Sequence, residues 1–245
     1  MRRNIKLVIA YDGTDFCGWQ RQDKDRTVQG EIELALEKMH GEPVSLAGCG
    51  RTDSGVHAVG QIANFFTDID SIPSDRFSPA LNTLLPHDVR ILHSCGVDDN
   101  FHARFSAVSR TYRYFFICRS LLPHQRLYNV CLRRFPDIAL LNAYGRLLLG
   151  ETDCSIFAGA GDTSNSKNRY IYSSVFFTEG EKLIFEIRAN AFLRNMVRSV
   201  AGTFLHYEEN SASPEQLRKI IASGERSQAG PTLPPQGLFL WNVEY

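Results

Sequence analysis

The sequence predicts an α+β fold built of two similar halves, each with a mainly antiparallel sheet flanked by helices. Strand-like and helix-like segments alternate along the chain, and no internal sequence repeat occurs. Short β-rich runs end at turn dipeptides such as Asp12-Gly13 and Glu179-Gly180. The 245 residues are 43% hydrophobic and 22% charged, which excludes collagen-like, disordered and coiled-coil proteins. A chain of this length can bury a core without disulfides.

Residues 1–104 are expected to form the first half, with the element order β-α-β-β-α-β. Its first helix is well marked, because apolar residues recur at helical spacing from Val28 to Met39 and Gly41 follows as a stop signal. The second helix is expected around residues 76–84. The strands are expected at residues 6–11, 44–47, 61–66 and 89–92.

Residues 105–245 are expected to form the second half. It opens with an aromatic, β-rich strand at 111–117 and closes with a strand at 238–243. Paired strands are expected at 170–177 and 183–188, and a polar, mobile surface loop at 158–168. A helix is expected at 138–148, with Pro136 in its first turn and Gly150 beyond its end, and another at 193–207. A third helix is expected to begin at Ser213, which caps it; Pro214 would be the first residue inside, and Gln216 would bond back to the cap.

Basic and acidic residues balance at 27 each, but they are unevenly distributed. The segments 101–135 and 187–206 contain no Asp or Glu. Guanidinium groups bind phosphates and aromatic rings stack on bases, so the first segment predicts an RNA-binding face. The alternative is a strand with solvated arginines and aromatic residues that belong to the core. The arginines of this segment are Arg104, Arg110, Arg113, Arg119, Arg126, Arg133 and Arg134.

Metal-binding and membrane-inserted classes of protein lack their usual sequence patterns here. The six cysteines form no CxxC pair and the seven histidines form no HExxH motif, so we expect no metal and reduced, buried cysteines. No apolar stretch reaches the length of a membrane helix, and the first residues do not form a signal peptide. The protein is therefore expected to be soluble and cytoplasmic.

The segment Gly50–His57 lies between two predicted strands and places Arg51 two residues before Asp53. A carboxylate that a loop presents, and that a cation keeps ionised, can act as a nucleophile or a general base. Taken alone, the segment favours a simpler interpretation, a glycine-rich turn in which Asp53 accepts backbone hydrogen bonds. His57 is expected to make structural hydrogen bonds, and Trp19 to be packed in the interior.

The sequence Gly50-Arg51-Thr52-Asp53-Ser54-Gly55-Val56-His57 resembles the signature loop of the TruA-type tRNA pseudouridine synthases. The resemblance runs in the family's order from residue 11 to residue 240. Cys17 and Cys154 depart from the residues usual at their positions. The other matching blocks are Tyr11-Asp12-Gly13 with Gly18–Gln22, Phe101–Ala107 followed by Tyr112-Arg113-Tyr114, Asn190–Arg198, and Gly237–Leu240.

This resemblance implies an isomerase that converts uridine to pseudouridine in the anticodon stem-loop of tRNA, at positions 38–40, without a metal or organic cofactor. It implies two ferredoxin-like or RRM-like halves with a catalytic cleft between them. It also implies a homodimer whose two subunits contact the anticodon arm of one tRNA.

The resemblance also implies a role for each of four residues. Asp53 is the implied nucleophile, which attacks the sugar or the uracil ring or acts as a base toward the sugar. Arg198 is its implied ion-pair partner. Tyr112 would stack on the flipped uracil, and Arg51 would fill the vacated space in the RNA stem or hold a phosphate.

Two other functions fit part of the sequence. A non-catalytic RNA-binding protein built from RRM-like modules, with Tyr112 and Tyr114 as stacking residues, explains the basic strand but gives no role to Asp53 beside Arg51. A small-molecule hydrolase that uses Asp53 and His57 would need an oxyanion hole or a nucleophile elbow, and the sequence contains neither pattern. The sequence therefore favours the synthase.

Overall fold

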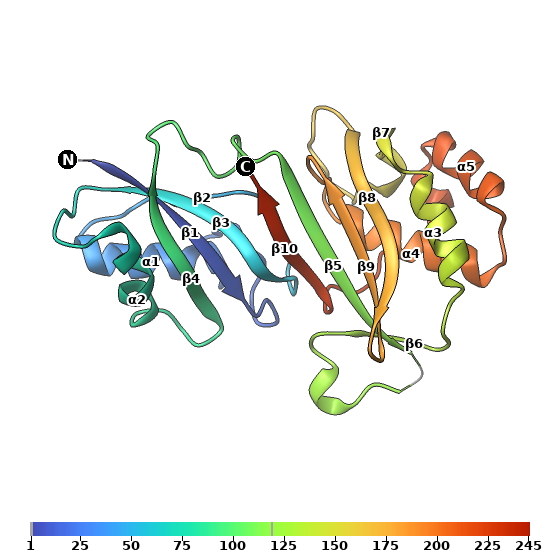
Figure 1. Cartoon of the computed structure of the whole chain (residues 1–245), viewed down its shortest axis with the longest axis horizontal. Helices are drawn as coiled ribbons and strands as arrows, with labels where there is room; N and C mark the ends of the chain where they lie inside the picture. Colours follow the sequence, from blue (N-terminus) through green and yellow to red (C-terminus); the bar gives the residue numbers. More distant parts are fainter. Residues whose placement is uncertain (1, 119) are drawn as a thin grey trace. The chain divides into compact units, whose positions relative to one another are not determined.

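The computed structural model describes residues 2–118 and 120–245 (Figure 1). The chain separates into two compact units, Met1–Val108 with Phe239–Tyr245, and Ser109–Leu238. Residues 239–245 were expected in the second half, whereas they pack in the first unit. The described residues form ten strands and five α-helices, which confirms the predicted α+β class.

The first unit follows the predicted order β-α-β-β-α-β up to residue 97. Its strands lie in the order β4-β1-β3-β10, with β2 also paired to β3. Neighbours are antiparallel except β10, which runs parallel to β3. The elements are β1 (Arg3–Tyr11), α1 (Val28–His40), β2 (Ala47–Gly48), β3 (His57–Thr67), α2 (Phe77–Asn82), β4 (Val89–Val97) and β10 (Leu238–Glu244).

Local sequence patterns account for the ends and faces of these elements. Alternate residues of β1, from Ile5 to Ile9, are fully buried, as expected for a strand with one face in the core. The Thr27 hydroxyl accepts a hydrogen bond from Gly30 N (3.3 Å) at the start of α1, and Gly41 ends the helix with a φ of 75°. Both α1 and α2 lie against the sheet of this unit (Figure 1).

The second unit contains an antiparallel sheet in the order β5-β9-β8-β7, and β6 runs parallel to β5. In Figure 1, α3, α4 and α5 lie together beside this sheet. The elements are β5 (Ser109–Cys118), β6 (Val130–Leu132), α3 (Ile138–Arg146), β7 (Gly150–Asp153), β8 (Asn168–Glu179), β9 (Lys182–Ala189), α4 (Met196–Glu209) and α5 (Pro214–Ser223).

Helix boundaries in this unit differ from prediction where a single residue decides them. Asp137 caps α3 by accepting a hydrogen bond from Leu140 N (3.1 Å), so Pro136 precedes the helix instead of lying in its first turn. Helix α4 begins at Met196 instead of 193, because Asn195 adopts a left-handed conformation with a φ of 60°. The capping box of α5, formed by Ser213 and Gln216, is confirmed.

The likeness of the two halves stays a prediction. After β5 the second unit runs through β6, α3, β7, the hairpin of β8 and β9, and α4, so it matches the first five elements of a β-α-β-β-α-β unit only when the short strands β6 and β7 are set aside. The strand that would complete such a unit is β10, and it pairs with β3 through Phe239↔His57 and Leu240↔Ala58.

Candidate active site

The loop that carries Asp53 connects β2 to β3. Asp53 is partly exposed, whereas Thr52 before it and Val56 after it are buried. Val56 N donates a hydrogen bond to Asp53 O (3.1 Å), which closes a tight turn over residues 53–56. The loop therefore anchors its backbone in the interior while the aspartate side chain is placed nearer the surface.

Residues 11–19, which precede this loop in the chain, form hydrogen bonds with it. Trp19 N donates to Thr52 O (3.1 Å), and the hydroxyl groups of Tyr11 and Thr52 share a hydrogen bond of 2.8 Å. Burial raises the pKa of Tyr11 well above its ordinary value, so this hydroxyl keeps its proton at neutral pH. Ser54 Oγ donates to Phe16 O (3.1 Å). The residues on both sides of Asp53 are thus bonded to one segment.

Gly18 brings the backbone of that segment close to the aspartate. Its φ is +86°, a conformation that side chains with a Cβ rarely adopt. A Cβ on Gly18 would lie 2.6 Å from Thr52 O and 3.2 Å from the carbonyl carbon of Asp53. Only glycine fits this position without moving the Asp53 loop. The sequence places Gly18 in a block that matches the family pattern, but no local signal reveals its contact with the loop.

His57 and Trp19 serve the structure, as predicted. His57 is fully buried, its Nδ1 accepts a hydrogen bond from Gly13 N (3.0 Å), and its ring stacks on Phe239 with centroids 4.6 Å apart. The same Nδ1 lies 3.2 Å from a carboxylate oxygen of Asp12. Trp19 is 2% exposed. His57 therefore joins the end of β1 to β3 and β10.

Arg51 is exposed, and its Nε donates a hydrogen bond to Gln20 Oε1 (3.0 Å). Gln20 belongs to the matching block Gly18–Gln22, so this block touches the block Gly50–His57 through side chains as well as backbone. The bond to Gln20 orients the guanidinium group at the surface beside the Asp53 loop. Arg51 and Asp53 thus lie in the same loop of the first unit.

Tyr112 and Arg198 belong to the second unit. Tyr112 lies on β5, is 9% exposed, and meets the ring of Phe192 edge to face with centroids 5.1 Å apart. Arg198 lies in the first turn of α4. Its Nε donates to Leu233 O (2.7 Å) and its Nη1 donates to Asn195 Oδ1 (3.0 Å). These two bonds give the guanidinium of Arg198 a defined direction.

The arginines of the acid-free segment are less uniform than the sequence suggested. Arg113 forms an ion pair with Glu186 (2.7 Å), and Arg134 forms one with Glu208 (2.7 Å). The segment lacks acids in sequence, but folding brings acids from β9 and α4 to two of its arginines, so these two are partly neutralised. Arg119 lies outside the described residues. The exposed arginines of the segment are Arg104, Arg126, Arg133 and Arg134.

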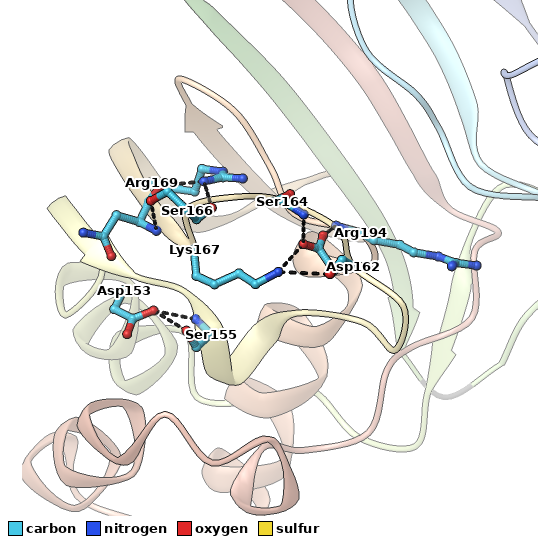
Figure 2. Close-up of polar contacts among 9 residues, drawn as sticks. Asp153, Ser155, Asp162, Ser164, Ser166, Lys167, Arg169 and Arg194 are labelled. Atoms are coloured by element: carbon cyan, nitrogen blue, oxygen red, sulfur yellow. Dashed lines mark hydrogen bonds and ion pairs between the residues drawn. The ribbon is translucent and has the colours of Figure 1, made fainter.

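Residues 158–168 are tied to the segment before α4 (Figure 2). The Asp162 carboxylate accepts hydrogen bonds from Lys167 Nζ (2.5 Å), Ser164 N (2.9 Å) and Arg194 N (2.7 Å). Burial opposes ionisation, but these donors hold the pKa of Asp162 well below its usual range. The Arg194 side chain extends away from the cluster (Figure 2). The predicted mobile loop is therefore anchored through a charged side chain.

Among residues 2–118 and 120–245, no group of three or more His, Cys, Asp or Glu side chains is arranged to hold a metal ion. No helix in the same part of the chain is long and apolar enough to span a membrane. Of the six cysteines, Cys49 and Cys154 are buried as expected, whereas Cys17 and Cys131 are exposed.

Comparison with known proteins assigns the chain to a family. A family model described as tRNA pseudouridine synthase matches residues 7–106 and 145–245. A tRNA pseudouridine synthase A of Treponema denticola is 53% identical over 100% of this chain and 93% of its own length. One of Caldicellulosiruptor saccharolyticus is 43% identical over 99% of this chain and 100% of its own.

A crystal structure of a Cbf5-Nop10-Gar1 complex aligns with 82% of this chain and 54% of that chain, at 9% identity and a TM-score of 0.36, which is too low to support a structural argument. The assignment depends on the sequence matches, which extend over the whole chain and include the loop around Asp53. The chain therefore belongs to the TruA-type tRNA pseudouridine synthases, a family of isomerases.

Proposed function

We propose that this chain isomerises uridine to pseudouridine in the anticodon stem-loop of tRNA, with Asp53 as the nucleophile. The observation that carries the proposal is the placement of Asp53 within the family's signature loop. Its neighbours Thr52 and Val56 are buried; Trp19 N donates a hydrogen bond to the backbone of Thr52, and the Tyr11 hydroxyl shares one with the Thr52 side chain. A reactive group is most effective when the structure around it keeps its position constant.

The reaction itself explains why a carboxylate suits this position. The N1–C1′ bond of uridine breaks, the uracil turns, and a new bond forms between C5 and C1′; C5 loses a proton and N1 gains one. A base stacked in an RNA helix cannot do this, so it must first be flipped out, at a cost of a few kcal/mol. A carboxylate at this position can attack the sugar or the ring, or remove a proton from the sugar.

The other three residues have supporting roles in the proposal. Arg51 lies in the same loop as Asp53 and would enter the space left by the flipped base or bind a phosphate. Tyr112 would stack on the uracil. Arg198 would keep the Asp53 carboxylate ionised, and its bonds to Leu233 and Asn195 support this role because they orient the guanidinium.

The proposal includes the partners that the family resemblance implies. The substrate is tRNA, bound through its anticodon arm by a homodimer in the cytoplasm, and neither a metal ion nor an organic cofactor takes part. Exposed arginines such as Arg51 and Arg104 supply positive charge for phosphate contacts.

The test measures tritium release from an unmodified tRNA transcript that is labelled at uracil C5. The wild type should release tritium, and Asp53→Asn should bind the transcript without releasing it, because the amide is not a nucleophile. Asp75→Asn is a matched control, since Asp75 is an exposed aspartate of the same unit whose carboxylate lies 3.6 Å from the exposed guanidinium of Arg76; it should behave as the wild type.

Each contrary result has a specific meaning. Tritium release by Asp53→Asn at the wild-type rate would refute the nucleophile assignment. A wild type that binds the transcript and releases no tritium would refute the synthase and leave the non-catalytic RNA-binding protein as the better explanation.

A further inference from the structure

The block Phe101–Ala107 matches the family pattern, but the proposed reaction gives it no role. It follows β4 in the first unit. Phe105 in this block is 76% exposed, the highest value among the exposed large hydrophobic side chains of the described residues. An aromatic side chain so fully in water contributes little to the core, so its position requires another explanation.

Two buried asparagines hold this block in place. Asn4 is 1% exposed, and its Nδ2 donates to Asp98 O (2.9 Å) and to Phe101 O (2.8 Å). Asn64 is 3% exposed; its Nδ2 donates to Asn4 Oδ1 (2.9 Å), and its Oδ1 accepts from Ala103 N (2.9 Å). Buried amides that are fully bonded fix their partners firmly, because an unpaired polar group in the interior is costly. The backbone at both ends of residues 98–103 is thus anchored to β1 and β3.

Further bonds close the turn that presents Phe105. Tyr245 donates its hydroxyl to Ala103 O (2.8 Å). Ser106 N donates to His102 O (2.9 Å), and His102 N donates to Ser106 Oγ (3.1 Å). These bonds fix the backbone on both sides of Phe105. Its exposure is therefore a property of an ordered turn and not the result of a loose segment.

The surroundings of the Phe105 ring indicate what it binds. The guanidinium of Arg104 lies 5.5 Å from the ring centroid, and the His102 ring lies 4.5 Å from it. The acids nearest to Phe105 in the sequence are Asp98 and Asp99. The Asp98 carboxylate accepts a hydrogen bond from Asn100 N (2.8 Å). An aromatic ring beside a cation matches an unpaired nucleotide, which offers a flat base and a phosphate.

We propose that Phe105 is a stacking platform for an unpaired base of the RNA substrate and that Arg104 binds an adjacent phosphate. The choice of RNA depends on the proposed function. The charged neighbour of the Phe105 ring, Arg104, also favours RNA over a protein partner, because the centre of a protein interface is usually depleted of charge. The turn is ordered before RNA arrives, so binding does not have to supply the free energy for ordering it.

The experiment measures the dissociation constant of an unmodified tRNA transcript at fixed salt, together with the urea midpoint of unfolding. Phe105→Ala should weaken binding about 5- to 150-fold, the range found when a stacking residue is removed, and leave the midpoint unchanged. Leu92→Ala is the matched control, because Leu92 is a 57% exposed apolar residue on β4. That control and Phe105→Tyr should bind as the wild type does.

A second variant tests the phosphate contact. Arg104→Gln should reduce the slope of log Kd against log salt concentration by about 1, because one fewer counterion is released. An unchanged slope would overturn this part of the proposal.

The outcomes separate this inference from the proposed function. If the wild type forms pseudouridine and Phe105→Ala binds the transcript normally, the stacking platform is refuted and the synthase stands. If the wild type forms no pseudouridine but Phe105→Ala still weakens tRNA binding, the synthase is refuted and the platform stands. If Phe105→Ala changes only the sedimentation of the free protein, the surface binds another copy of the chain and the inference is wrong.

Discussion

Gly18 offers a direct way to displace the Asp53 loop without touching the reactive side chain. A Cβ at Gly18 would lie 2.6 Å from Thr52 O, whereas ordinary contact begins at 3.4 Å. The backbone of the loop, or that of residue 18, must therefore move by the difference of about 0.8 Å. Because Thr52 directly precedes Asp53, Gly18→Ala is expected to shift the carboxylate as well.

The structure supplies a matched control for the strain that alanine itself introduces. Gly41 has a φ of +75°, close to the +86° of Gly18, but no atom lies within 4 Å of the position that a Cβ would take there. Alanine at either position costs about 1–2 kcal/mol for the left-handed conformation. Only Gly18→Ala adds the displacement, and a misplacement of about 1 Å can lower the rate about 100-fold.

The assay compares kcat for pseudouridine formation and the urea midpoint for the wild type and both variants. Both variants should be destabilised, Gly18→Ala the more, and only Gly18→Ala should lose kcat, by about 10- to 100-fold. Equal kcat values for the two variants would refute the reasoning that the contact between Gly18 and Thr52 positions Asp53.

Two further predictions concern charged side chains in the second unit. Asp162→Asn should lower the free energy of unfolding by about 1–3 kcal/mol at pH 7, because Lys167 loses its ionic partner. The folded-state pKa of Asp162 is depressed, so its contribution is complete above the unfolded pKa of about 3.9 and is lost as the pH falls through the folded value. Urea titrations should therefore show the gap between wild type and variant narrowing below about pH 4, and a constant gap would contradict this. Arg134→Ala should lower the urea midpoint more than Arg133→Ala does, because it leaves the 5% exposed Glu208 without its bidentate partner. Since Arg134 itself is half exposed, the loss should stay below the roughly 3–5 kcal/mol of a fully buried pair; equal midpoints would show that this ion pair contributes nothing.

Local patterns in the sequence were sufficient for most elements of the fold. The apolar spacing from Val28 to Met39 and the stop at Gly41 predicted α1, and the capping box at Ser213 predicted the start of α5. Such features depend on residues within one or two turns of each other, so they can be read without knowledge of the rest of the chain. The order β-α-β-β-α-β of the first unit followed from the same kind of signal.

Family resemblance, and not physical pattern, singled out Asp53. Taken alone, Gly50–His57 favoured a simple turn, and the structure shows that a turn is indeed present at residues 53–56. The structure adds the reason why that turn is held firmly: Trp19 and Tyr11 form hydrogen bonds with Thr52 directly before it, and Ser54 Oγ donates to Phe16 O from within it. The roles of Arg51, Asp53, Tyr112 and Arg198 stay predictions until the variants are measured.

The sequence by itself determined the α+β class, the clearest helices, the uneven distribution of charge and the family. Only the tertiary structure decided that β10 pairs with β3, that Glu186 and Glu208 neutralise two arginines of an acid-free segment, and that Gly18 packs against the Asp53 loop. Each of these joins residues far apart in the chain. Local periodicity carries no information about such contacts, because they form only when the hydrophobic faces of separate elements have been buried against one another.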